Sequence, residues 1–145
     1  MKDPRSGPIA IVVIALVLLN KFAAMEALLV GDARILLLLA PVLGRALVVL
    51  LLITTPYVRP EGLGAPYARF LPRLSCGLMV LLISTVTVAA LDWRGGALLG
   101  VLGLGFFGLR QALLHRLGGI TGDTLGAACE LAETAVLLVP LLLPD

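Results

Sequence analysis

The apolar stretch IAIVVIALVLLNKFAAMEALLV, residues 9–30, decides the fold class of this chain. Its length is close to the roughly 20 residues that an α-helix needs to cross the hydrocarbon core of a bilayer. Similar stretches follow at residues 35–55, 74–91, 96–114 and 125–143. Apolar residues lie on all sides of each stretch rather than alternating, which argues against barrel strands. We therefore predict an all-α, polytopic membrane helix bundle with about five transmembrane helices.

The composition also requires lipid as the solvent for much of the surface. The 145 residues are 60% hydrophobic and 14% charged, with a mean hydropathy of +1.10. Soluble domains carry about 45–50% apolar and about 25% charged residues, so a soluble fold of this length could not bury so much leucine, valine and alanine. The net charge of +2 and the 5% aromatic content argue against nucleic acid as a partner. We expect residues 1–145 to form a single transmembrane domain in a lipid bilayer.

Lysine and arginine are distributed unevenly among the connections, which predicts the orientation of the chain. Cytoplasmic loops carry an excess of these residues. With the N-terminus in the cytoplasm, seven of them lie inside and two, Arg34 and Arg94, lie outside. The inner residues are Lys2, Arg5, Arg59, Arg69, Arg73, Arg110 and Arg116. We therefore predict that the N-terminus and the polar motifs are cytoplasmic and that the C-terminus is outside.

The longest connection is PYVRPEGLGAPYARFLPR, residues 56–73. Its prolines and glycines break helices, which predicts a structured loop at the membrane surface, with Tyr57 and Tyr67 as interfacial anchors. Arg59 lies in a turn that the neighbouring prolines restrict. Arginine suits bidentate phosphate recognition, but surface anchoring fits the spacing equally well.

The sharpest polar motif is GGITGDTLGAACELAE, residues 118–133. Gly119 and Gly122 would let the backbone approach a ligand closely, and a glycine-rich helix start offers free N–H groups to a phosphate. Thr121 or Asp123 could cap the helix that follows. Glycines four residues apart are also typical of close packing between membrane helices, so both interpretations stay open.

Three acidic residues belong to this motif. On a helix, Asp123 and Glu130 are seven residues apart and share a face, and Glu133 lies one turn beyond Glu130. Mg²⁺ favours one or two protein carboxylates together with phosphate oxygens. Acidic residues inside an apolar span are rare and usually functional. These residues are therefore candidate Mg²⁺ ligands near a diphosphate.

Charged residues inside or just before the spans are the remaining candidates. Lys21 and Arg45 lie within spans, where a charge costs roughly 2.5–3.5 kcal/mol on insertion scales. A structural ion pair and a phosphate-binding role both explain them, and a polar cavity shared with Glu130 would accommodate either. The N-terminal residues Lys2, Asp3 and Arg5 fit ordinary positive-inside flanking.

Several of these motifs resemble segments of the cobalamin synthase family, adenosylcobinamide-GDP ribazoletransferase. The run at residues 118–133 resembles the C-terminal signature of that family. MKDPRSG (1–7), APVLGRA (40–46) and PYVRPEGLG (56–64) resemble its central segment, its next helix and the following loop. The resemblance implies transfer of adenosylcobinamide phosphate from adenosylcobinamide-GDP to α-ribazole or its 5′-phosphate, with release of GMP. It also implies a requirement for Mg²⁺ and location in the bacterial inner membrane.

The resemblance further implies roles for individual residues. The expected Mg²⁺ ligands are Asp3, Asp123, Glu130 and Glu133. The expected catalytic residues are Asp123, Glu130, Arg45 and Arg59, and the expected substrate-binding residues are Lys2, Arg5, Lys21, Gly119, Thr121 and Gly122.

Members of that family begin upstream of the segment that matches Met1, and their upstream part holds further helices and an acidic cluster. We therefore expect the chain to correspond to the C-terminal part of a longer protein, to be inactive alone, and to require that part or a second copy of itself. The alternative from the residues alone is a small multi-pass transporter or ion-binding protein, in which the intramembrane charges line a substrate path.

Overall fold

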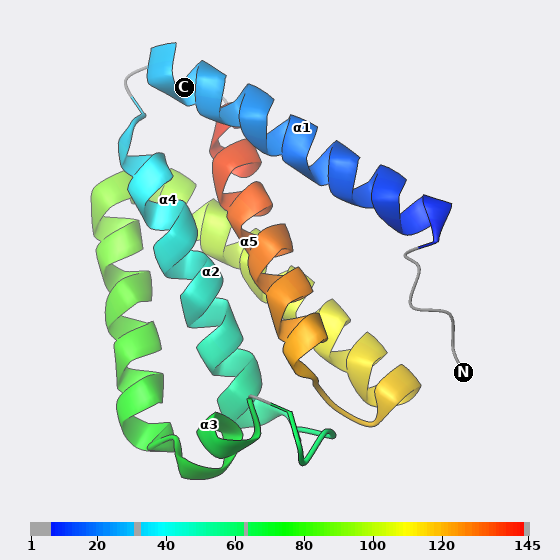
Figure 1. The fold of residues 1–145 in the computed structure, drawn as a ribbon. Helices are drawn as coiled ribbons and strands as arrows, with labels where there is room; N and C mark the ends of the chain where they lie inside the picture. Colours follow the sequence, from blue (N-terminus) through cyan, green and yellow to red (C-terminus); the bar gives the residue numbers. More distant parts are fainter. Residues whose placement is uncertain (1–6, 31–32, 63, 144–145) are drawn as a thin grey trace.

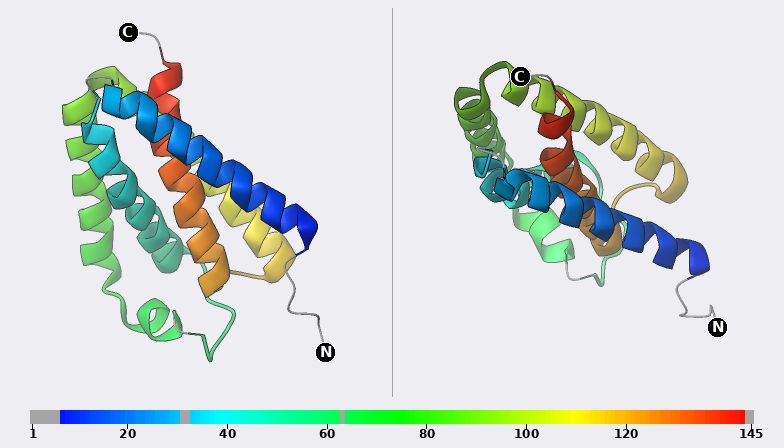
Figure 2. Two further views of the ribbon diagram at one scale, coloured as in Figure 1. Left: turned by 45° about the horizontal axis from the view of Figure 1, so that its top comes forward. Right: turned by 90° about the horizontal axis from the view of Figure 1, so that it is seen from above.

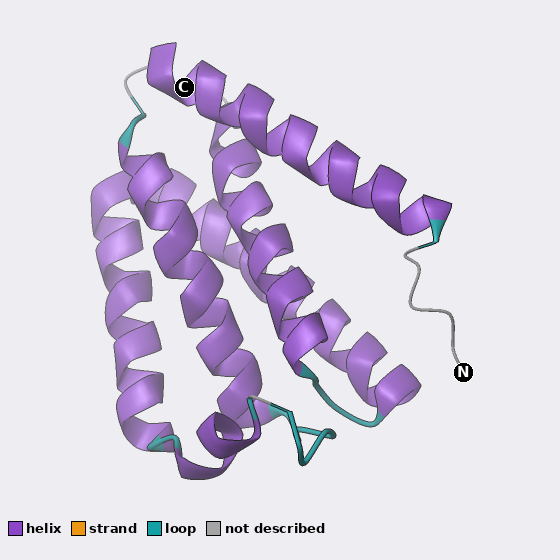
Figure 3. Ribbon diagram, in the orientation of Figure 1, coloured by secondary structure: helices purple, strands orange, loops and turns teal. Residues whose placement is uncertain are grey.

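The computed structural model describes residues 7–30, 33–62 and 64–143. Within these ranges the chain is built from helices and contains no strand (Figures 1 and 3). The helices are α1 (Pro8–Val30), α2 (Ile35–Thr54), α3 (Ala65–Phe70), α4 (Arg73–Leu117) and α5 (Gly122–Leu142). All except the short α3 are long and apolar enough to cross a membrane. The prediction of an all-α membrane helix bundle is therefore confirmed.

The long helix α4 contains two of the predicted spans. Asp92 has a φ of +50° and a ψ of −133°, and the chain reverses there, so that residues 73–91 and 93–117 form two arms (Figure 1). Gly95 allows this turn to close, because a Cβ at that position would lie 2.7 Å from the carbonyl oxygen of Thr87. The predicted spans thus correspond to α1, α2, the two arms of α4, and α5.

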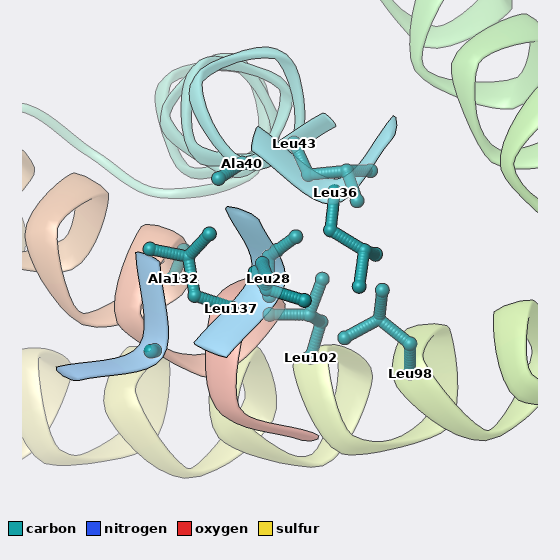
Figure 4. Close-up of a cluster of buried hydrophobic side chains, with 10 residues drawn as sticks. Leu28, Leu36, Ala40, Leu43, Leu98, Leu102, Ala132 and Leu137 are labelled. Atoms are coloured by element: carbon teal, nitrogen blue, oxygen red, sulfur yellow. The ribbon is translucent and has the colours of Figure 1, made fainter. Parts of the chain in front are cut away.

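Helix α2 occupies the centre of the bundle and packs against α5 and α4, while α1 crosses obliquely over one side (Figures 1 and 2). The main core joins the four long helices (Figure 4). It includes Leu28 from α1, Leu36, Ala40 and Leu43 from α2, Leu98 and Leu102 from α4, and Ala132 and Leu137 from α5. The first half of α1 contributes no buried residue to this core, so α1 is held by its second half.

The end of α2, the helix α3 and the connection between α4 and α5 lie together at one end of the bundle, opposite the Asp92 turn (Figure 1). The connection between α4 and α5 is short because both helices have strong end signals. Gly118 ends α4 in a left-handed conformation with a φ of 74°. Thr121 caps α5, since its hydroxyl accepts a hydrogen bond from the Thr124 N–H, and the Thr124 hydroxyl accepts one from the Thr121 N–H.

Candidate functional site

The loop after α2 and the connection before α5 are joined by backbone hydrogen bonds. The Val58 N–H donates to the Ile120 carbonyl at 3.0 Å, and the Ile120 N–H donates to the Pro56 carbonyl at 2.9 Å. Gly119 makes this contact possible, because a Cβ there would lie 2.2 Å from the Pro56 carbonyl oxygen. The structure therefore gives Gly119 a role in backbone packing. Its predicted contact with substrate stays a prediction.

This backbone contact places Arg59 beside Asp123. The Arg59 Nη1 atom lies 3.0 Å from the Asp123 Oδ2 atom, and the two side chains are 64% and 81% exposed. Asp123 is in the first turn of α5, where a negative charge is stabilised by the helix dipole. Because both side chains are exposed, they are accessible to a charged ligand at this end of the bundle. An exposed ion pair contributes little to stability, so a ligand could replace it at small cost.

Tyr57 packs against the glycines of its own loop. A Cβ on Gly62 would lie 2.4 Å from the Tyr57 hydroxyl, and one on Gly64 would lie 2.8 Å from the ring. Gly122 also faces this hydroxyl, at an ordinary 3.6 Å for an added Cβ. Tyr67 of α3 is 67% exposed, and the interfacial role of both tyrosines stays a prediction.

A second charged site lies within the membrane-spanning part of the bundle. The Lys21 ammonium of α1 lies 2.5 Å from the Glu130 Oε2 atom and 2.7 Å from the Glu133 Oε2 atom of α5. The Lys21 side chain is only 14% exposed, and that of Glu133 is 17% exposed. A single ammonium thus bridges two carboxylates and links the first long helix to the last.

Arg45 of α2 completes this intramembrane charge cluster, which we define as Lys21, Arg45, Glu130 and Glu133. Its Nη1 atom lies 2.6 Å from the Glu133 Oε1 atom and donates to the Pro41 carbonyl at 3.0 Å. Two cations and two carboxylates leave the cluster without net charge, which reduces the cost of holding charges in a span. Lys21 and Arg45 are therefore ion-paired, as one of the two interpretations requires, while their phosphate-binding role stays a prediction.

The predicted acidic residues divide between the two sites. Asp123 and Glu130 are seven residues apart on α5, which separates them by about 10 Å along the helix axis. Asp123 pairs with Arg59, whereas Glu130 and Glu133 share Lys21. Among residues 7–30, 33–62 and 64–143, no three His, Cys, Asp or Glu side chains gather closely enough to hold a metal ion. Lys2, Asp3 and Arg5 lie outside the described residues.

Two residues that the sequence analysis did not select support these sites. Gly44 lets α2 approach α5, since a Cβ there would lie 2.8 Å from Glu133 Cγ and 3.2 Å from Cys129 Sγ. Arg110 donates from Nη2 to the Thr54 carbonyl at 3.1 Å and so joins α4 to the end of α2. The position of Gly44 directly before the intramembrane Arg45 is the one sequence signal that could have identified it.

The fold and the two charged sites define a multi-pass α-helical membrane protein with charges both inside the bundle and at one of its ends. The family model for cobalamin-5-phosphate synthase matches residues 1–141, and the chain belongs to this family. This membership confirms the resemblance inferred from the sequence motifs.

Curated relatives from several pseudomonads carry the name adenosylcobinamide-GDP ribazoletransferase. The protein from Pseudomonas syringae pv. syringae (strain B728a) is 54% identical over 144 residues, which are 99% of this chain and 59% of the relative. The proteins from Stutzerimonas stutzeri (strain A1501) and Ectopseudomonas mendocina (strain ymp) are 49% and 53% identical, and each match covers 95% of this chain and 56% of the relative. The chain therefore spans less than two thirds of the length of these relatives. No solved structure matches it.

Proposed function

We propose that this chain forms part of an adenosylcobinamide-GDP ribazoletransferase of the bacterial inner membrane, with the Arg59–Asp123 end of the bundle in the cytoplasm. The names of its relatives and its family membership support the reaction. The excess of arginine and lysine in the connections at this end supports the orientation. The small-transporter alternative has no comparable support from the relatives.

The proposed reaction is a phosphoryl transfer. A hydroxyl of α-ribazole, or of its 5′-phosphate, attacks the phosphorus atom that bears the cobinamide group, and the bond from that phosphorus to the oxygen of GMP breaks. The hydroxyl proton passes to water. Catalysis of phosphoryl transfer consists mostly of positioning and of neutralising charge on phosphate oxygens. The protein therefore needs cations and metal-binding groups near one another.

The observation that carries this proposal is the exposed Arg59–Asp123 pair on a fixed backbone framework. The backbone hydrogen bonds between the loop and residue 120 join the two segments that carry these side chains. Arg59 would bind diphosphate oxygens through its planar guanidinium. Asp123 would then lose its partner and become free to contact Mg²⁺, and the Thr121 cap fixes the helix start that carries it.

The carboxylates of the intramembrane charge cluster also suit Mg²⁺. Glu130 and Glu133 converge on one ammonium, and Mg²⁺ is bound by one or two carboxylates together with phosphate oxygens. When bound, the ion would supply charge neutralisation at the diphosphate. Lys21 and Arg45 would stabilise phosphate oxygens from the protein side. Asp123 lies too far along α5 to join Glu133 on a single ion, so it would serve a separate position.

The proposal is tested by measuring GMP release from adenosylcobinamide-GDP and α-ribazole. Membranes would contain this chain together with the unmatched part of the P. syringae relative, with and without Mg²⁺. We expect release only with Mg²⁺, and Asp123→Asn should reduce it by at least ~10²-fold, by analogy with the loss of a single preorganised charge contact. Arg59→Gln should reduce it similarly.

Arg34→Gln is the matched control, since Arg34 is an exposed arginine at the start of α2, away from both charged sites. It should leave the rate of GMP release unchanged. Equal rates for the native chain and Asp123→Asn would remove Asp123 from the site. Absence of GMP release from membranes in which both parts are present would contradict the proposed reaction.

A further inference from the structure

The central helix α2 has one uncovered stripe. Apart from Thr54 at its end, its exposed side chains are those at four positions that recur at helical spacing and therefore share a face. They are Ile35 (45% exposed), Leu38 (69%), Val42 (42%) and Arg45 (65%). The other faces of α2 pack against α4 and α5. The stripe is thus a defined surface on an otherwise enclosed helix.

Arg45 makes this stripe unsuitable for contact with lipid chains. It lies near the middle of α2, about 14 Å from each end of the helix. Charged side chains at such a depth face a bundle interior or a water-filled cavity. Only Nη1 of Arg45 has a hydrogen-bond partner among the described residues, in Glu133 and Pro41, although a guanidinium has five N–H donors. The remaining donors require acceptor oxygens, which lipid chains lack.

Helix α5 also carries an exposed charged side chain, Glu130, that needs polar surroundings. Glu130 is 57% exposed although Lys21 binds one of its oxygens. Glu130 and Arg45 are connected through Glu133 and Lys21. Two exposed, oppositely charged side chains at mid-span need polar surroundings from a neighbouring segment.

We propose that the α2 stripe is an intramembrane contact surface for helices of the part of the relatives that this chain does not match. The length of that part supports this occupant, because the chain covers only 59% of the P. syringae relative. That part would present backbone or side-chain acceptor oxygens to those donors of Arg45 that bind neither Glu133 nor a phosphate. The inference depends on the depth and exposure of Arg45 and not on the reaction proposed above.

The test places a spin label on the stripe and measures its collisions with oxygen, which dissolves in lipid, and with a nickel chelate, which dissolves in water. The label replaces Val42, one turn from Arg45, in a chain whose two cysteines, Cys76 and Cys129, are changed to alanine. The chain is reconstituted at one copy per lipid nanodisc, alone and with the unmatched part of the P. syringae relative. A label at Leu82, 64% exposed on the first arm of α4, is the control.

We expect the unmatched part to co-purify with the chain and to lower oxygen collisions at position 42 severalfold without raising nickel collisions, while position 82 stays unchanged. Arg45→Met should reduce the recovery of the unmatched part, and Arg34→Met should not. A label at position 42 that stays accessible to oxygen would overturn the proposal, as would failure to co-purify. Shielding that appears only with two copies per nanodisc would assign the stripe to a second copy, and a gain in nickel collisions would assign it to a water-filled cavity.

Discussion

Gly44 of α2 faces Glu133 of α5 at a distance that leaves no room for a side chain, since a Cβ on Gly44 would lie 2.8 Å from Glu133 Cγ. Glu133 is also the residue that pairs with both Lys21 and Arg45. Helices α2 and α5 therefore lie close together where their charges meet. Packing and charge pairing at this point depend on each other.

Gly44→Ala should separate α2 from α5 at the charge cluster and lower the stability of the bundle. Overpacking in a close contact costs about 1–3 kcal/mol. Thermal unfolding in detergent or lipid would measure the change. Gly126→Ala on α5 is the matched control, because nothing lies within 4 Å of a Cβ added there. A Gly44→Ala protein that unfolds at the native temperature would contradict the predicted clash.

Gly119→Ala should break the backbone contact between the loop after α2 and the start of α5, because the new Cβ would meet the Pro56 carbonyl oxygen. Arg59 and Asp123 would then no longer be held together. Distances between spin labels at Glu61 and Gly126 should become longer and broader. Gly122→Ala is the control, because its new Cβ would make only an ordinary contact with Tyr57. In this variant the distances between the two labels should match those of the native protein.

Glu133→Gln should destabilise the protein more than Glu130→Gln. Glu133 is 17% exposed and pairs with both cations, whereas Glu130 is 57% exposed and pairs with Lys21 alone among the residues that the structure describes. Removing one partner of a buried ion pair leaves an uncompensated charge, at a cost of up to about 3–5 kcal/mol. The two variants would be compared by unfolding in the same lipid. Equal losses, or a larger loss for Glu130→Gln, would refute this order.

Asp123→Asn should leave stability nearly unchanged, in contrast to its expected effect on GMP release. The Arg59–Asp123 pair is exposed on both sides, and such pairs contribute about 0–1 kcal/mol. Unfolding measured on the same preparation as the activity separates the two effects. A large loss of stability would assign Asp123 a structural role instead.

The predicted orientation is tested by a cysteine at Glu61, an exposed residue of the loop after α2. Gly62 is unsuitable, because any Cβ there would clash with the Tyr57 hydroxyl. With Cys76 and Cys129 changed to alanine, an impermeant thiol reagent added outside intact cells should leave position 61 unlabelled. A cysteine at Arg34, at the opposite end of α2, should react. The reverse pattern would invert the orientation.

The fold could be predicted from the sequence because membrane spans require long apolar runs, and these are visible without knowledge of tertiary contacts. The predicted spans 74–91 and 96–114 also place a turn between residues 91 and 96. The sequence does not reveal the backbone geometry of this turn. That geometry depends on Gly95 contacting Thr87, a contact between two helices that spacing along the chain does not reveal.

For the candidate site, the sequence indicates charged residues but not which of them pair with one another. The helical spacing of Asp123, Glu130 and Glu133 suggested one group of acids, but spacing along α5 carries no information about which cations approach from α1, α2 and the loop. Gly119 accommodates the carbonyl of Pro56, a packing role that its spacing does not reveal, and its contact with substrate stays a prediction. Contacts between segments distant in the chain decide these pairings.

The bridge from Lys21 to Glu130 and Glu133 joins residues that are 109 and 112 positions apart. Ribosomes add about 5–20 residues per second, so Lys21 is translated roughly 5–20 s before the carboxylates that neutralise it. During that interval the Lys21 ammonium lacks the two carboxylates that neutralise it in the folded bundle. The intramembrane charge cluster is therefore completed only when α5 enters the bilayer.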